Sequence, residues 1–310
     1  MNVYGSVHEL IGNTPVVELK NIEIPNNCRI FAKLEFMNPG GSVKDRLGLS
    51  LLRDAEESGQ LLPGGTIIEP TAGNTGIGVA LAAIGKGYTV KFVVPQKFSM
   101  EKQTLMRALG AEIVNTPTEL GMKGAIEKAK ELVQETPGAF SPSQFSNPAN
   151  PETYVQTLGP ELWRDLDGEI DVFVAGAGSG GTFMGTAKYL KSQNANIKTV
   201  IVEPEGSILN GGEAGSHYTE GIGMEFLPAY MDKSYFNAIH TVTDRDAFDK
   251  LRELSSKEGL LVGSSSGAAL FASLEEAKVA KRGSHIVTIF ADSSERYLSQ
   301  NVYDLLKEDE

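Results

Sequence analysis

The sequence has 310 residues, of which 41% are hydrophobic and 22% are charged, and its formal net charge at pH 7 is −12. This is the composition of an ordinary globular enzyme, and the length is enough for two lobes with sizeable cores. An acidic surface repels nucleic acid and anionic membranes, so we expect a small-molecule substrate, no nucleic acid and no membrane as partners.

Residues with metal or redox chemistry are few. The single cysteine cannot form an internal disulfide, and the four histidines are too widely spaced to suggest a metal site. The N-terminal residues lack the basic and apolar regions of a secretory signal, and no later stretch is apolar for the length that a bilayer requires. We therefore expect a cytoplasmic protein without a metal.

Strands and helices are expected to alternate along most of the chain, because apolar residues recur with period two in some stretches and with a helical period in others. Strands are expected at 16–19, 29–35, 66–69, 89–94, 112–115, 171–175, 198–203, 240–243 and 285–290. Helices are expected at 46–58, 76–86, 100–110, 123–135, 154–166, 182–193, 244–258, 268–281 and at the C-terminal end. The alternation is typical of α/β folds, and the long glycine-rich stretch 204–232 is expected to be a functional loop.

A glycine turn from Asn38 to Arg46 lies between a predicted strand and a predicted helix, and it places Lys44 in the first helical turn. Unpaired N–H groups at a helix N-terminus disfavour a cation, so we expect the pKa of Lys44 to be lowered. A neutral amine is a nucleophile. On this pattern alone, an ordinary solvated lysine is the alternative.

A second glycine turn, from Gly176 to Thr182, follows a predicted strand and opens a helix. Such a turn points backbone N–H groups at an anion, and the hydroxyls of Ser179 and Thr182 add donors, so a phosphate is the expected ligand. The spacing also fits the dinucleotide fingerprint G-x-G-x-x-G, with Glu203 in the place of the ribose-binding acid. A nicotinamide cofactor is therefore a second hypothesis, and a turn with a purely structural role is a third.

Two more loops precede helices. In the loop that ends at Gly76, the N–H groups and the hydroxyls of Thr71 and Thr75 suit a carboxylate, and the Asn74 amide can donate to a ring oxygen. The loop 263–267 holds three serines that could cap the next helix or bind a ligand, and helix capping is the simpler interpretation of either loop. One hypothesis uses all four loops: pyridoxal phosphate bonded to Lys44.

The motifs Asn38-Pro-Gly-Gly-Ser-Val-Lys44-Asp-Arg, Gly73-Asn-Thr75 and Gly178-Ser-Gly-Gly-Thr182 together resemble those of the cysteine synthase and cystathionine β-synthase family. The resemblance covers nearly the whole chain. It implies an α/β fold of the fold type II (tryptophan synthase β-like) class of pyridoxal phosphate enzymes, with two domains that are each a twisted, mostly parallel sheet flanked by helices. It further implies a smaller mobile domain at 38–146 and a larger domain made of 1–37 and 147–310.

The same resemblance implies roles for individual residues. Lys44 would form a Schiff base with the cofactor and act as the catalytic base. The other cofactor-binding residues would be Asn74 at the ring oxygen, Ser265 at the ring nitrogen, and Gly178, Ser179, Gly180, Gly181 and Thr182 at the phosphate. The substrate would be bound by Thr71, Ala72, Gly73, Thr75, Gln144 and Gly221. Ala72 stands where the family usually has serine, which removes a hydroxyl from this loop.

The implied reaction is a β-replacement on O-acetylserine or serine through an α-aminoacrylate. The stretches 203–209 and 218–223 look more like those of cystathionine β-synthases, and the glycine loops resemble the bacterial O-acetylserine-dependent enzymes. We therefore expect homocysteine as acceptor and cystathionine as product, as in reverse transsulfuration. A cysteine synthase that uses sulfide is the alternative.

The resemblance also bears on assembly. It implies a homodimer with the active site in the cleft between the lobes, and some cysteine synthases bind serine acetyltransferase. Because Lys44 comes early and the chain ends at Glu310, we expect neither the haem-binding extension nor the regulatory domain of the animal cystathionine β-synthase, and no haem.

Overall fold

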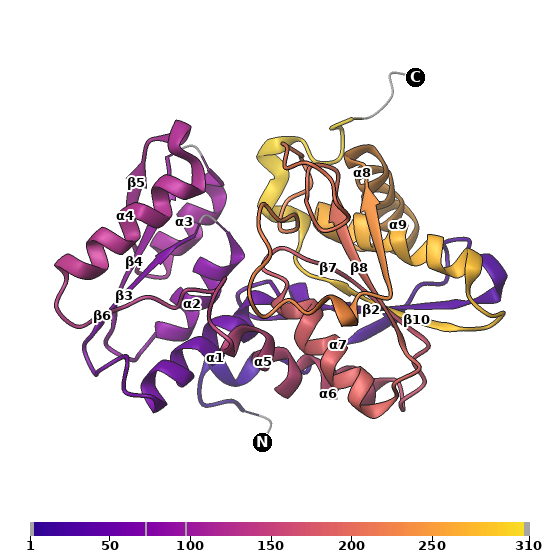
Figure 1. Ribbon diagram of the computed structural model, residues 1–310, viewed down its shortest axis with the longest axis horizontal. Coiled ribbons are helices and arrows are strands. Elements are labelled where there is room, and N and C mark those ends of the chain that lie inside the picture. The colour runs from indigo at the N-terminus through magenta and orange to yellow at the C-terminus, as the bar shows by residue number, and fades with distance from the viewer. Residues whose placement is uncertain (1–2, 72, 97, 307–310) are drawn as a thin grey trace. The chain divides into compact units, whose positions relative to one another are not determined.

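The computed structural model describes residues 3–71, 73–96 and 98–306 (Figure 1). Contacts within the chain divide it into two compact units. Unit 1 consists of Met1–Ile11 and Lys44–Asn150, and unit 2 of Gly12–Val43 and Pro151–Glu310. Compared with the ranges expected from the sequence, this division puts residues 1–11 and 147–150 with the smaller unit and residues 38–43 with the larger one. The mobility of the smaller domain stays a prediction.

Unit 1 is built on a four-stranded parallel sheet with the strand order β5-β4-β3-β6 (Figure 1). The strands are β3 (Thr66–Pro70), β4 (Thr89–Pro95), β5 (Glu112–Thr116) and β6 (Ala139–Phe140), and the helices are α1 (Lys44–Glu57), α2 (Asn74–Ala83), α3 (Met100–Ala108) and α4 (Gly121–Glu135). Successive residues of a strand point to opposite faces of a sheet. Accordingly, Ile67 packs with Ile77 of α2, whereas its neighbour Ile68 packs with Ala125 of α4.

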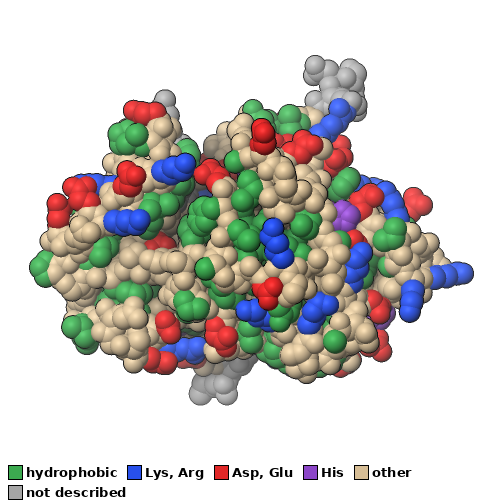
Figure 2. All heavy atoms as spheres, viewed as in Figure 1, with side chains coloured by type: hydrophobic (Ala, Val, Ile, Leu, Met, Phe, Trp, Pro, Cys, Tyr) green, Lys and Arg blue, Asp and Glu red, His purple; other side chains and the backbone are tan. Residues whose placement is uncertain are grey.

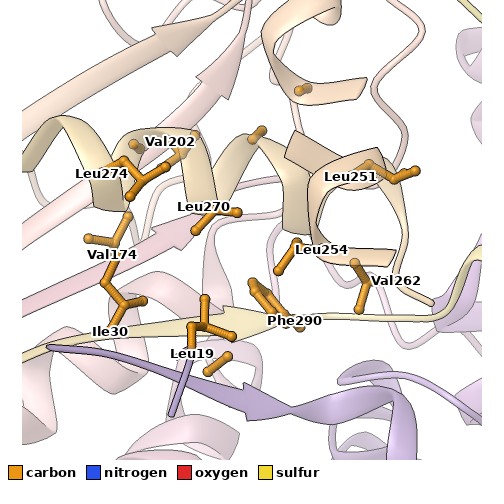
Figure 3. Close-up of a cluster of buried hydrophobic side chains, with 14 of the residues drawn as sticks. Leu19, Ile30, Val174, Val202, Leu251, Leu254, Val262, Leu270, Leu274 and Phe290 are labelled. Carbon is orange, nitrogen blue, oxygen red and sulfur yellow. The ribbon is translucent and has the colours of Figure 1, made fainter. Parts of the chain in front are cut away.

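Unit 2 is built on a six-stranded sheet with the order β1-β2-β10-β7-β8-β9, in which only the β1–β2 pair is antiparallel. Its strands are β1 (Val16–Glu18), β2 (Arg29–Leu34), β7 (Val172–Gly176), β8 (Lys198–Pro204), β9 (Ala238–Val242) and β10 (His285–Phe290). The helices are α5 (Ala149–Gln156), α6 (Leu158–Asp165), α7 (Gly181–Gln193), α8 (Asp244–Glu253) and α9 (Ser264–Val279). Leu270 and Leu274 of α9 pack over Ile30 and Val174 of the sheet (Figure 3).

Five elements differ from the sequence prediction, and one of them is α9, which begins at Ser264 rather than at residue 268. The helix expected at 154–166 is divided at Thr157, whose backbone is not helical and whose hydroxyl donates to the Thr153 carbonyl at 2.6 Å. The helix expected at 244–258 ends at Glu253 and continues as a π-helical turn. The expected C-terminal helix is the short 3₁₀ helix Ser294–Gln300. Strand β6 was missed because two residues carry no periodicity.

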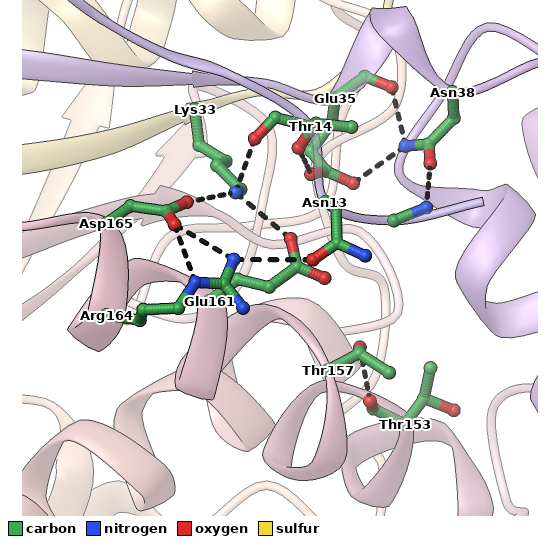
Figure 4. A network of polar contacts seen from close by, with 11 residues as sticks. Asn13, Thr14, Lys33, Glu35, Asn38, Thr153, Thr157, Glu161, Arg164 and Asp165 are labelled. Carbon is green, nitrogen blue, oxygen red and sulfur yellow. Dashed lines mark hydrogen bonds and ion pairs between the residues drawn. The ribbon is translucent and has the colours of Figure 1, made fainter. Parts of the chain in front are cut away.

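A buried ion network supports the start of unit 2 (Figure 4). Lys33 on β2 is fully buried, and its amine donates to the Thr14 carbonyl at 2.6 Å and to the Asp165 carboxylate at 2.7 Å, with Glu161 at 3.0 Å. A buried charge is tolerated when it is paired and hydrogen-bonded. The network therefore fixes the turn at Thr14 to β2 and α6.

The segment 38–43, which directly precedes Lys44, is held within unit 2. The Asn38 carboxamide donates to the Glu35 carboxylate at 3.0 Å and accepts from the Gly12 N–H at 2.8 Å (Figure 4). The Arg296 guanidinium donates to the Gly40 carbonyl, and the Val43 N–H donates to the Ala291 carbonyl at 2.9 Å. Unit 2 thus fixes the backbone up to the residue before Lys44.

The surface in Figure 2 shows acidic and basic side chains interspersed rather than gathered in one basic patch. Within the described ranges, no helix is long and apolar enough to cross a membrane. The same part of the chain has no group of three or more His, Cys, Asp or Glu side chains placed to hold a metal ion.

Helices α1 and α2 pack against each other through two glycines. A Cβ added at Gly48 would lie 2.2 Å from the Gly78 carbonyl, and a Cβ added at Gly78 would lie 2.3 Å from the Lys44 carbonyl oxygen. Neither position can hold a side chain unless the helices separate. The close packing brings the first turns of α1 and α2 together in unit 1.

We expect Gly48→Ala to lower the free energy of unfolding by about 1–3 kcal/mol, because overpacking forces the backbone apart. Alanine forms helices better than glycine by about 1 kcal/mol. A net loss of unfolding free energy would therefore come from the steric contact with Gly78. Denaturation in urea measures the effect. Gly215→Ala is the control, since its added Cβ would meet no atom closer than 3.6 Å. Equal stability of the two variants would contradict the prediction.

Candidate active site

Lys44 is the first residue of α1, and its side chain is half-buried. Burial disfavours the charged ammonium and lowers the pKa of Lys44 from 10.5 to about 8. The direction agrees with the sequence prediction, although burial is the cause that the structure identifies rather than the helix N-terminus. A fraction of the amine is therefore neutral near physiological pH and available as a nucleophile or base.

The loop between β3 and α2 lies in the same unit as Lys44. The Gly73 N–H donates to the Thr71 hydroxyl at 3.3 Å, and Asn74 is the first residue of α2. The Thr75 hydroxyl donates to the Gln144 side-chain carbonyl at 2.8 Å, which joins two stretches that are 69 residues apart. Unit 1 therefore brings these predicted substrate residues together at the start of α2. Ala72 lies outside the described residues.

Glu69, at the end of β3, is a residue of this region that the sequence did not single out. It is 1% exposed, and its carboxylate accepts from the Ser143 N–H at 2.9 Å, the Gln144 N–H at 3.3 Å and the Ser141 hydroxyl at 3.1 Å. Burial raises the pKa of Glu69 to about 7, although these three donors act in the opposite direction. Its sequence position in a strand gave no sign of this role.

The glycine loop of unit 2 joins β7 to α7. Gly180 has a left-handed backbone with φ of 83° and precedes the first residue of α7. The N–H groups in the first turn of a helix have no acceptor within the helix, so they can bind an anion. Ser179 and Thr182 are largely buried beside them. The loop therefore presents unpaired N–H groups at a helix start, and the phosphate assigned to it stays a prediction.

The long loop 204–232 packs against this glycine loop. A Cβ added at Gly178 would lie 2.4 Å from the Gly221 carbonyl oxygen, and one added at Gly221 would lie 3.9 Å from the Ser265 hydroxyl. Unit 2 therefore gathers Gly178, Gly221 and Ser265, which are far apart in the sequence. Ser265 is the second residue of α9 and is 7% exposed.

Two supporting residues come from the same long loop and were missed by the sequence analysis. The Tyr230 hydroxyl donates to the Ser179 carbonyl at 2.8 Å. The Met231 sulfur would lie 2.2 Å from a Cβ added at Gly180, so this methionine fills the space beside a glycine whose positive φ of 83° already disfavours a side chain. No periodic pattern in the loop could have indicated either contact.

The structure also bears on the dinucleotide hypothesis. The acid in the ribose-binding position, Glu203, is fully buried. Its carboxylate accepts from the Leu209 N–H at 2.8 Å, the Asn210 N–H at 3.0 Å and the Thr241 hydroxyl at 2.9 Å. A carboxylate that is engaged in this way is not available to a ribose, so the main support for a nicotinamide cofactor is lost.

Residues 7–292 match the model of a protein family described as pyridoxal-phosphate dependent enzyme. The chain belongs to this family. The family, together with the two sheets, confirms the predicted fold class and the predicted resemblance.

Individual relatives cover almost the full chain. It is 60% identical over 304 residues to the O-acetylserine dependent cystathionine beta-synthase of Bacillus subtilis, covering 98% of this chain and 99% of that protein. It is 51% identical to a cysteine synthase of Helicobacter pylori, covering 98% and 100%. The crystal structure of the O-acetylserine dependent cystathionine beta-synthase from Helicobacter pylori superimposes with a TM-score of 0.94, at 51% identity and with 98% and 100% coverage.

We expect the Lys44 amine of cofactor-free protein to gain reactivity up to about pH 8 and then to level off, because a pKa of about 8 leaves it neutral above that pH. Trace acetylation at pH 6–10.5, with mass spectrometry of the Lys44 peptide, measures this reactivity. The exposed Lys20 in the same digest is the reference. Reactivity of Lys44 that still rises steeply at pH 10 would show that burial does not lower its pKa.

Proposed function

We propose that the chain catalyses a β-replacement in which the sulfur of homocysteine displaces acetate from O-acetylserine and cystathionine is formed. The observation that carries the proposal is the half-buried Lys44, with its lowered pKa, in a chain of the pyridoxal-phosphate dependent family. The 60% identity to an O-acetylserine dependent cystathionine beta-synthase along almost the whole length supports the choice of donor and acceptor. Serine is the alternative donor.

The described residues fit pyridoxal phosphate. We propose that Lys44 bonds to the cofactor, that Asn74 contacts its ring oxygen and that Ser265 contacts its ring nitrogen. The phosphate would be bound by Gly178, Ser179, Gly180, Gly181 and Thr182. The support is the start of α7, where the N–H groups of the first turn have no acceptor within the helix and can bind an anion. Haem is no part of this proposal.

When it is bound, pyridoxal phosphate withdraws electrons from the amino acid attached to it, which favours loss of the Cα proton and of the β-substituent. The amine of Lys44 then serves as the base that takes this proton and later returns it. A pKa of about 8 suits both directions of transfer near neutral pH, since each protonation state is populated. A solvated lysine at 10.5 would hold its proton too tightly to act as the base.

We propose that the α-carboxylate of the donor binds at the start of α2, with Thr71, Ala72, Gly73, Thr75 and Gln144 around it and Gly221 contributing from the long loop. The N–H groups of the first α2 turn favour an anion. The hydroxyl of Thr75 and the carboxamide of Gln144 are already hydrogen-bonded to each other, which fixes both before a substrate arrives.

A cysteine synthase activity, with sulfide as acceptor, is the second candidate. Among Helicobacter pylori relatives that are 51% identical to this chain, two are named cysteine synthase, and a solved structure is named an O-acetylserine dependent cystathionine beta-synthase. Similarity at this level therefore does not determine the acceptor. We further propose a cytoplasmic homodimer, with serine acetyltransferase as a candidate partner.

With O-acetylserine as donor, we expect kcat/KM for homocysteine to equal or exceed that for sulfide, and cystathionine to accumulate. Mass spectrometry of the products and initial rates at equal donor concentration measure the two reactions. A preference for sulfide by orders of magnitude would make the enzyme a cysteine synthase. Conversion of neither acceptor would refute the proposed reaction altogether.

We expect the purified protein to be yellow and Lys44→Ala to be colourless and at least about 10³-fold slower, since the amine is both the attachment point and the base. Borohydride reduction should fix the cofactor on the Lys44 peptide, which mass spectrometry detects. Lys123→Ala, at an exposed position of α4, is the matched control and should keep its colour. A coloured, active Lys44→Ala enzyme would contradict the assignment.

A further inference from the structure

Each unit carries a buried glutamate followed by proline at the carboxyl end of a parallel strand. Glu69 is the last residue but one of β3 and Glu203 the last but one of β8, and both are at most 1% exposed. Each carboxylate accepts two successive backbone N–H groups and one hydroxyl, Glu69 from the stretch 141–144 and Glu203 from Leu209, Asn210 and Thr241. The two glutamates thus hold irregular backbone in the same manner in two different units.

The segment held by Glu69 is conformationally costly. Ser143 has a left-handed backbone with φ of 53°, which a residue with a side chain seldom adopts unless its surroundings enforce it. The Ser143 N–H is bound by Glu69, and the Ser143 carbonyl accepts from the N–H groups of Ser146 and Asn147 at 2.9 and 3.0 Å. These contacts keep the turn in place directly before Gln144.

Gln144 itself is held at three points. Its N–H is bound by Glu69, its backbone carbonyl accepts from the Asn150 carboxamide at 2.8 Å, and its side-chain carbonyl accepts from Thr75 at 2.8 Å. Glu69 lies two residues before Thr71, so it directly precedes the loop that leads to α2. A change at Glu69 therefore reaches both stretches that the proposed function assigns to the substrate carboxylate.

We propose that Glu69 is a positioning residue, which fixes the 141–144 turn so that Gln144 and Thr75 are preorganised to bind the donor's α-carboxylate. The identity of the bound ligand rests on the proposed function, whereas the role of Glu69 in holding the 141–144 turn does not. A carboxylate is needed, because an amide offers a single acceptor oxygen. In Glu69→Gln one N–H of Ser143 or Gln144 would face an NH₂ group instead of an oxygen.

The test compares Glu69→Gln with Glu203→Gln, which removes an equally buried carboxylate with the same set of donors from unit 2. At pH 8.5, above the pKa of about 7 of Glu69, we expect Glu69→Gln to raise the KM for O-acetylserine about tenfold or more. Its kcat should change much less. Glu203→Gln should leave this KM within about twofold.

Amide hydrogen exchange of the full-length proteins supplies the readout that does not depend on activity. We expect faster exchange at 141–147 in Glu69→Gln and unchanged exchange there in Glu203→Gln. Normal exchange at 141–147 in Glu69→Gln, or faster exchange without a rise in KM, would overturn the inference. If the wild type neither binds pyridoxal phosphate nor converts O-acetylserine, the proposed function fails, and the exchange data still decide whether Glu69 holds the turn. Should Glu69→Gln not fold, Glu69→Asp keeps the charge, and smaller changes in the same direction are expected.

Discussion

The attachment of Lys44 is the constraint on which the rest of the structure depends. The residues before it are held to unit 2 by Asn38, Arg296 and the Ala291 carbonyl, whereas Lys44 itself begins the first helix of unit 1. The backbone up to Val43 is thus fixed within unit 2, and the start of α1 is fixed within unit 1 by the α1–α2 contact. A lysine amine that must act as nucleophile and base needs such a fixed environment, both to lower its pKa and to hold its direction.

Glycines and buried glutamates together determine the backbone conformation of the loops in both units. Where backbones must touch, as between Gly48 and Gly78 or between Gly178 and Gly221, glycine removes the side chain that would separate them. Where irregular backbone must be held, a buried acid such as Glu69 or Glu203 accepts its N–H groups. A glycine and a buried carboxylate each lower the free energy of unfolding when they stand alone. Close backbone packing offsets the cost of the glycine, and hydrogen bonds offset the cost of the carboxylate. They place polar loops at the carboxyl ends of parallel strands, where α/β proteins bind ligands.

The acceptor substrate distinguishes enzymes that share the same type of reaction. Both names, cystathionine beta-synthase and cysteine synthase, occur among relatives that are 51% identical to the chain, so similarity at this level does not fix the acceptor. The long loop 204–232 packs against the glycine loop through Gly221 and Met231, and loops of this kind vary more readily than the elements that they connect.

The sequence by itself determined the order of the longer strands and helices, without β6, and singled out Lys44 and the glycine loop before α7 as candidates, because periodicity and glycine turns are local properties of the chain. Boundaries such as the division at Thr157 depended on a side chain that competes for a backbone carbonyl, which no periodic pattern records. Only the tertiary structure decided that Glu203 is engaged, that burial lowers the pKa of Lys44, and that Glu69 holds the turn before Gln144. These properties arise from contacts between residues as many as 75 positions apart, and such contacts exist only once the sheets have formed.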